Sequence, residues 1–494
     1  MIWFYLISGL FLGWTLGAND ACNIFGTAVT TKMLRFRFAA ILASTFIVIG
    51  AVISGGGTSH TISELGEVNA LAGAFTVSLA SGLTVFVFIK NGYPVSVSQS
   101  IVGSIVGWCI FTSTPVDIPS LTRIVITWIV NPFISGIFAY LIFKLIKHSL
   151  KKLNIHILEI DFYTRMALIL VLIFGSYSLG ANNIAKVIGV FINSNPFKDV
   201  NVLNIFTIPA LNQLFMLGAF AMAVGIFTYS KRNIETVGGE IFTLSPVSAL
   251  ASVLASSIVL FLFSSESIEK LLHNLNLPAL PLVPVSITQS MVGAIIGIGV
   301  AKGVTNLNFR ILGKISVGWI ITPIASAVVC FVLLFFVQNV FQAKIVVPIS
   351  YELSEPVINE IKKTNAYTDS LSKYKFEVFH SQFEFRKSLN EIGIEKEEYL
   401  YSIFAIAKIE NYLIDSNLAK QKLSPDNFTD EQIQNIKKYH GKYFTHKWQI
   451  VNEFSSISPG WRYLEDTPVN KYFNKFLKTR FEIIFDTFKI KESK

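Results

Sequence analysis

Two short polar strings, each present twice in otherwise apolar sequence, hold the side chains that could do chemistry in this chain. Gly-Ala-Asn-Asp at residues 17–20 recurs as Gly-Ala-Asn-Asn at 180–183. Pro-Val-Ser-Val-Ser-Gln-Ser at 94–100 recurs as Pro-Val-Ser-Ile-Thr-Gln-Ser at 284–290. The strings come in the same order in both places, so the sequence indicates two copies of one unit.

The types of these residues point to ion binding. Asn19, Asp20 and Asn23 offer amide groups and one carboxylate that can ligate a hard cation through oxygen. Pro94 and Pro284 would each start a helix, whose free N–H groups and dipole attract anions, and Ser, Thr and Gln side chains add neutral donors. Neither copy of the Pro-Val-Ser string contains Lys or Arg, so a bound anion would be held by neutral donors that can also release it. Two facing strings of this kind would make a pocket for a tetrahedral oxyanion.

The composition of the chain indicates that membrane-spanning segments must position these strings. Hydrophobic residues make up 52% of the 494 residues and charged residues only 15%, against about 25% in an average soluble protein. This excludes soluble, disordered and disulfide-scaffold classes and indicates a polytopic membrane protein. The net charge of +9 falls almost entirely before residue 345, so it indicates cytoplasmic loops and not nucleic-acid binding.

Ten apolar stretches are long enough for membrane segments, since a span needs about 20 residues. They run over 2–31, 38–54, 71–89, 95–113, 121–143, 163–193, 203–229, 242–263, 285–300 and 316–341. The stretches 2–31 and 163–193 are too long for one straight crossing, and both contain the Gly-Ala-Asn string. Because Gly17 and Gly180 can leave helical geometry, we expect both helices to be broken there.

Each copy then holds a broken span, a full span, a re-entrant hairpin with Ser-x-Ser/Thr-Gln at its tip, and a last span. Three crossings per copy give the two copies opposite orientations. The basic residues fall on one side in this arrangement, which we take as cytoplasmic: Lys32, Arg35, Arg37, Lys144, Lys147, Lys151, Lys152, Lys231, Arg232, Lys302, Arg310 and Lys314. The amino terminus and the C-terminal segment would lie outside.

The predicted fold class is an all-α polytopic membrane protein with two inverted-topology repeats, broken helices and re-entrant hairpins, plus a mostly helical soluble C-terminal domain. Residues 1–143 form repeat 1, 144–162 a basic linker, 163–344 repeat 2 and 345–494 the C-terminal domain. Inverted repeats with interrupted helices are typical of secondary transporters, which bind substrate near the membrane midplane.

The paired Gly-Ala-Asn and Pro-Val-Ser strings, together with Lys-Arg-Asn-Ile-Glu-Thr-Val-Gly at 231–238, resemble the inorganic phosphate transporter (PiT) family of cation-coupled permeases. The resemblance covers residues 1–341 and leaves 345–494 outside. It implies phosphate import across the plasma (inner) membrane, coupled to a sodium or proton gradient, by a multi-pass protein that forms a homodimer. It implies inorganic phosphate, a coupling cation and the lipid bilayer as partners, with no nucleic acid, no cofactor and no enzymatic activity.

The resemblance and the neighbouring polar positions give the candidate site. Expected to bind the substrate are Asn19, Asn23, Ser96, Ser98, Gln99, Ser100, Asn182, Asn183, Ser286, Thr288, Gln289 and Ser290. Expected to bind the cation are Asp20, Asn19, Asn182 and Glu235, with sodium at Asp20. No residue is expected to be catalytic.

Three positions depart from the family pattern. The second-repeat Asp of the family is Asn183 here, its second-repeat Asn is Lys186, and the acidic position that pairs with Glu235 is His60. Our hypothesis is that Lys186 fills a cation position or pairs with Asp20, so that coupling uses fewer sodium ions or protons.

Other interpretations stay open at the level of sequence. Gly17 and Gly180 could serve close helix packing, and the serines could bond back to their own helices. His60 could be a solvated loop residue and Glu235 an ion-pair partner of the basic residues beside it. The substrate could be sulfate or another tetrahedral oxyanion, and the protein could be an anion channel. A membrane enzyme lacks a nucleophile–base pair or metal cluster, and ATP-driven transport lacks a Walker A string.

Overall fold

The computed structural model describes residues 2–91, 95–114, 116–153, 156–202, 206–232, 234, 244–275, 280–303, 309–380, 382–394, 396–423, 428–465 and 470–490. The chain divides into two compact units, Met1–Val347 and Pro348–Lys494. This division lies close to the predicted end of the membrane part at residue 344.

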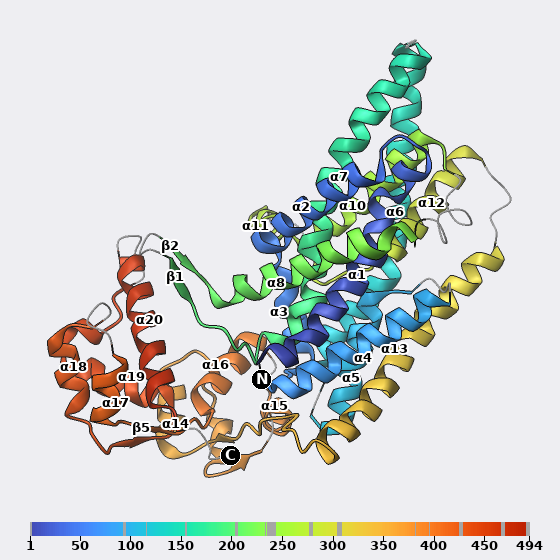
Figure 1. The fold of residues 1–494 in the computed structure, drawn as a ribbon. Coiled ribbons are helices and arrows are strands. Elements are labelled where there is room, and N and C mark those ends of the chain that lie inside the picture. The colour runs from blue at the N-terminus through green and yellow to red at the C-terminus, as the bar shows by residue number, and fades with distance from the viewer. Residues whose placement is uncertain are drawn as a thin grey trace. The chain divides into compact units, whose positions relative to one another are not determined.

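Unit 1 is built almost entirely of helices (Figure 1). Its α-helices are α1 (Ile2–Thr30), α2 (Phe36–Ser54), α3 (Gly56–Gly66), α4 (Leu71–Lys90), α5 (Val97–Thr112), α6 (Ile118–Leu153), α7 (Ile157–Ile188), α8 (Ala210–Gly225), α10 (Pro246–Ser264), α11 (Glu266–Asn274), α12 (Ile287–Lys302) and α13 (Phe309–Asn339). Short elements are the 3₁₀ helix η1 (Gly189–Phe191), the π-helical turn η2 (Ile226–Ser230) and the antiparallel strands β1 (Val200–Val202) and β2 (Phe206–Ile208).

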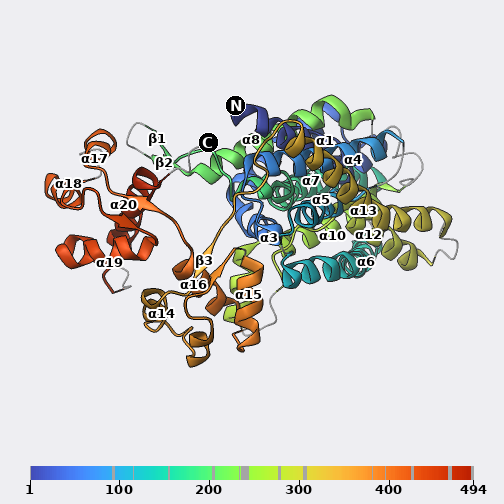
Figure 2. The same ribbon diagram turned by 90° about the horizontal axis from the view of Figure 1, so that it is seen from below.

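Eight of the described helices are long and apolar enough to cross a membrane, and α5 and α12 are shorter apolar helices. The prediction of an all-α polytopic membrane protein is therefore confirmed. Helices α7 and α10 are mostly buried, whereas α6 and α13 are mostly exposed and carry large apolar side chains such as Phe133 and Ile324 on their open faces. Figure 1 shows α13 along one edge of the bundle, and Figure 2 shows α6 along another edge, with α7 among the other helices. The short helix α3 was not predicted.

The expected breaks at Gly17 and Gly180 are absent, so this part of the prediction is wrong. Helix α1 continues from Ile2 to Thr30, and α7 continues from Ile157 to Ile188. Each glycine instead lets another helix approach, because an added Cβ would collide with a backbone carbonyl: Met222 at Gly17 and Ile47 at Gly180. Small residues at such contacts are a general feature of helix packing in membranes.

These close contacts repeat between the two copies. Gly17 on α1 lies against Met222 on α8, and the equivalent Gly180 on α7 lies against Ile47 on α2. The short helices follow the same rule, since an added Cβ at Gly103 on α5 would meet α13 and one at Gly293 on α12 would meet α6. Each copy thus packs its site-bearing helices against the other copy. The opposite orientation of the copies in a membrane and the sidedness of their loops stay predictions.

The segment 144–162, predicted as a basic linker, is largely helical. Helix α6 extends to Leu153 and α7 begins at Ile157. In Figure 1 these ends project from the bundle as a helical hairpin, drawn in teal.

Unit 2 is mostly helical, as predicted, and holds two hydrophobic cores in sequence order, one over residues 351–407 and one over 412–488. Its helices are α14 (Glu355–Ile361), η3 (Asp369–Tyr374), α15 (Gln382–Glu391), α16 (Glu397–Ala407), α17 (Ser416–Lys422), α18 (Asp430–Lys437), α19 (Lys447–Ile457), η4 (Pro459–Trp461) and α20 (Asn470–Phe488). Two antiparallel pairs complete it: β3 (Tyr351–Glu352) with β4 (Val378–Phe379), and β5 (Tyr412–Leu413) with β6 (Tyr443–Phe444).

A buried carboxylate joins several segments of unit 2. Glu410 accepts hydrogen bonds from Lys489 at 2.8 Å and from the Tyr412 hydroxyl at 3.1 Å. Lys408 and Lys447 lie 3.4 and 3.7 Å from its oxygens. Burial by itself raises the pKa of Glu410, but the hydrogen bond from Lys489 and the three ammonium charges outweigh burial and lower the pKa to about 2.

This depressed pKa predicts how the stability of unit 2 depends on pH. The ionised carboxylate stabilises the fold fully above its ordinary pKa of 4.5, and this contribution is lost as the pH falls toward about 2. Replacing Glu410 by Gln should therefore cost about 1–2 kcal/mol at pH 7 and little at low pH. Hydrogen–deuterium exchange of peptides from 399–490 in the full-length protein measures this. The exposed Glu355→Gln is the control, and equal protection of both variants at pH 7 would contradict the prediction.

Candidate functional site

Each copy of the Pro-Val-Ser string leads into a short buried helix. Ser96 is the N-cap of α5, and its hydroxyl accepts from the Gln99 backbone N–H. Ser286 caps α12 in the same way, with Gln289 as the donor. A helix start leaves four N–H groups without an intrahelical partner, and each cap satisfies one of them. Both helix starts therefore keep N–H groups that can face a ligand.

The two helix starts meet each other, as the sequence predicts. The Ser98 hydroxyl donates to the carbonyl of Val285 at 3.1 Å, and the Thr288 hydroxyl donates to the carbonyl of Val95 at 3.4 Å. Each tip thus contacts the residue just before the N-cap of the other tip. Positions 95 and 285 correspond in the repeated string, so the contacts are reciprocal between the copies.

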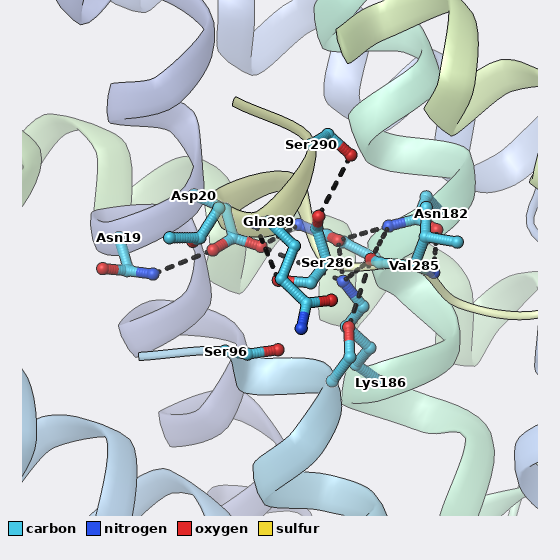
Figure 3. Close-up of polar contacts among 12 residues, drawn as sticks. Asn19, Asp20, Ser96, Asn182, Lys186, Val285, Ser286, Gln289 and Ser290 are labelled. Atoms are coloured by element: carbon cyan, nitrogen blue, oxygen red, sulfur yellow. Dashed lines mark hydrogen bonds and ion pairs between the residues drawn. The ribbon is translucent and has the colours of Figure 1, made fainter. Parts of the chain in front are cut away.

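Helix α7 makes hydrogen bonds through Asn182 to Val285, in the segment that leads into α12. The Asn182 side-chain amide donates to the Val285 carbonyl at 2.9 Å, and its side-chain oxygen accepts from the Val285 N–H at 2.8 Å. Lys186, one turn further on α7, donates to the same carbonyl at 2.8 Å. Figure 3 shows these side chains gathered around Val285. The Val285 carbonyl therefore accepts from Ser98, Asn182 and Lys186 together.

Asp20 on α1 completes the polar centre. Its carboxylate accepts from the Asn19 amide and from the Asn183 amide of α7, each at 2.9 Å. The Lys186 ammonium lies 4.0 Å from the same carboxylate, and both side chains are almost fully buried. The hypothesis for Lys186 gave two alternatives, and one of them, pairing with Asp20, agrees with this contact. The buried pair has no net charge, so its two side chains together leave the polar centre neutral.

Two acceptors at the tips are unused. The side-chain oxygens of Gln99 and Gln289 are buried, and within the described residues neither has a hydrogen-bond partner. In the view of Figure 3 the amide of Gln289 extends toward Ser96 of the opposite tip. A buried polar atom without a partner costs about 1–3 kcal/mol. The ends of these two side chains are therefore candidate contacts for a ligand.

Several predicted site residues have other surroundings. The Ser100 hydroxyl donates to the Ser81 carbonyl, and the Ser290 hydroxyl donates to the side-chain oxygen of Asn131. Asn23 is half-buried, and the described residues give its side chain no hydrogen bond. His60 is exposed, but it lies on α3 and not in a loop. Glu235 lies outside the described residues.

Asn131 on α6 is a site-supporting residue that the sequence analysis missed. Its amide donates to the Ser286 carbonyl at 3.0 Å while its oxygen accepts from Ser290 at 2.6 Å. It therefore fixes the first turn of α12. The signal that could have found it is the Asn131-Pro132 pair, which corresponds to Thr322-Pro323 in the second copy.

Known proteins resemble this chain over most of its membrane part. The family model described as "Phosphate transporter family" matches residues 16–330 and 275–440. The second range continues past residue 341, so the expectation that the likeness ends there is wrong for 345–440.

Two of the curated relatives match about two thirds of this chain. A protein named "Putative phosphate permease" from Haemophilus influenzae is 26% identical, and the match covers 69% of this chain and 97% of the relative. A protein of the same description from Methanocaldococcus jannaschii is 25% identical, with 66% and 95% covered. A solved structure, "The sodium-dependent phosphate transporter", matches with a TM-score of 0.52 and 24% identity over 68% of this chain and 99% of that one. This structural likeness supports the fold.

Proposed function

The chain belongs to the phosphate transporter family, and we propose that it imports inorganic phosphate across the plasma (inner) membrane, driven by a sodium or proton gradient. The protein acts as a homodimeric symporter in this proposal, and each protomer has its own site between the starts of α5 and α12. The observation that carries the proposal is the reciprocal contact of these two helix starts beside Asp20.

The donor set supports an oxyanion as substrate. Two helix starts point their free N–H groups and positive dipole ends into one region, and hydroxyl and amide groups line it. The anion can leave again because these donors are neutral and the ammonium of Lys186 already has three oxygen neighbours.

Two buried acceptors that have no partner among the described residues favour phosphate over sulfate. Near neutral pH, phosphate carries at least one hydroxyl group, whereas sulfate carries none. The buried side-chain oxygens of Gln99 and Gln289 can accept hydrogen bonds from phosphate hydroxyls but would stay unpaired beside sulfate. Sites built to pair with a substrate hydroxyl discriminate strongly against analogues that lack it.

Oxygen ligands for the coupling cation lie next to the anion region. Asp20 supplies a buried carboxylate, and Asn19 and Asn23 of the same helix supply amide oxygens. A cation bound there would offset the charge of the anion, so the two ions stabilise each other's binding. Because most side chains of the site are buried, transport requires the helices around α5 and α12 to open alternately to each side.

The test is uptake of radiolabelled phosphate by proteoliposomes that contain the full-length protein. We expect phosphate to accumulate against its gradient only when an inward sodium or proton gradient is imposed, and an excess of sulfate to leave most uptake intact. Sulfate uptake with the same gradient dependence would instead assign a sulfate permease. Phosphate flux that ignores both cation gradients would contradict coupling and indicate an anion channel.

A further inference from the structure

The two copies differ at two polar positions in and just after the Gly-Ala-Asn string. Asp20 and Asn23 of the first copy correspond to Asn183 and Lys186 of the second. The second copy thus replaces a carboxylate by an amide and an amide by an ammonium. This exchange removes one negative charge and adds one positive charge at the same place.

The Lys186 ammonium is held as a bound cation would be. It is fully buried, and its nitrogen contacts Asn183 Oδ1 at 2.7 Å, the Val285 carbonyl at 2.8 Å and Asp20 Oδ2 at 4.0 Å. These are a side-chain amide, a backbone carbonyl and a carboxylate, the oxygen types that ligate hard cations. In Figure 3 the ammonium lies within this group of oxygens.

The position in the first copy that corresponds to Lys186 is Asn23, whose side chain carries no charge. Asn23 is half-buried without a hydrogen bond in the described part of the chain, and the Val95 carbonyl accepts from Thr288 at 3.4 Å. Its counterpart Val285 accepts from three donors. Among the described residues, the Val95 carbonyl of the first copy therefore has fewer donors than the Val285 carbonyl of the second, so it is better able to ligate a mobile cation.

A mobile cation cannot share the second place with Lys186. Two unit charges about 4 Å apart in a partly buried environment repel enough to weaken binding about a thousandfold. We infer that Lys186 is a tethered cation that permanently fills one of two corresponding cation sites, so that this transporter moves one mobile cation fewer per phosphate than a chain with both sites open. The inference rests on the proposed cation-coupled phosphate transport.

The test compares wild type with Lys186→Asn, which restores the residue of the first copy, and with Asn183→Asp/Lys186→Asn, which restores both. The coupling ratio is read from the sodium or proton gradient that just stops net phosphate flux in proteoliposomes. We expect the ratio to be higher by one cation in both variants. The exposed Lys90→Asn, at the end of α4, is the control and should keep the wild-type ratio.

A second readout does not need transport. Sodium, compared with choline, should raise the unfolding temperature of each Lys186 variant in detergent more than that of the wild type. An unchanged coupling ratio in variants that transport, or an equal sodium effect in variants that do not, would overturn the inference. Absence of phosphate flux in the wild type under every gradient would instead refute the proposed function, and the sodium effect would still decide the role of Lys186.

Discussion

Replacing Gln99 or Gln289 by Ala is expected to reduce phosphate uptake by about 10- to 100-fold. Both side chains lie in the first turn of their helices, and both carry a buried oxygen without a partner in the described residues. A hydrogen bond to a charged ligand contributes about 1.5–3 kcal/mol, which corresponds to this factor. Uptake at saturating sodium or proton gradient, with the phosphate concentration varied, measures the loss.

The unfolding temperature of each Gln variant distinguishes a side chain that contacts the ligand from one that only supports the fold. Because the Gln oxygens have no hydrogen-bond partner in the part of the chain that the structure describes, their removal should leave the unfolding temperature nearly unchanged in the absence of phosphate. The exposed Gln338→Ala on α13 is the matched control and should transport normally. If both tip variants kept wild-type uptake, the anion site would be misplaced.

Replacing Asp20 by Asn is expected to abolish gradient-driven uptake and to destabilise the protein by about 3–5 kcal/mol. The substitution leaves the buried Lys186 ammonium without its carboxylate, and breaking a buried ion pair by removing one partner costs this much. It also removes the only side-chain carboxylate among the described residues in contact with Lys186, Asn19 and Asn183. Thermal unfolding in detergent and uptake in proteoliposomes measure the two effects.

The double variant Asp20→Asn/Lys186→Met distinguishes these effects. It removes both charges, so most of the lost stability should return. Uptake should stay absent, because the carboxylate proposed to bind the coupling cation is still missing. Wild-type uptake by the double variant would show that Asp20 serves only as the partner of Lys186.

The outline of the fold was readable from local features of the sequence. Apolar stretches of bilayer length predicted the eight long helices and the two short ones, because the length of a span follows directly from the thickness of the bilayer. The repeated strings predicted that Ser98 and Thr288 belong to facing tips, because identical units tend to make equivalent contacts. The contacts of both residues with the opposite tip agree with this.

The prediction of broken helices failed for a physical reason. A glycine in an apolar helix permits either a break or the close approach of a second backbone, and the sequence around Gly17 and Gly180 is compatible with both. The choice depends on whether a carbonyl of another helix lies against the glycine. Residues Met222 and Ile47, far away in the chain, supply those carbonyls.

The sequence by itself determined which elements this protein contains: its membrane helices, the two copies of its repeated unit and the polar residues that can bind ions. It also showed that Lys186 places an ammonium where the first copy has an amide. Only the tertiary structure decided the partners: that the Val285 carbonyl receives three donors, that Asn131 supports α12, and that Lys186 lies among oxygens beside Asp20. Hydropathy and repetition are properties of neighbouring residues, whereas a polar centre assembled from α1, α5, α7 and α12 depends on how helices of different copies pack.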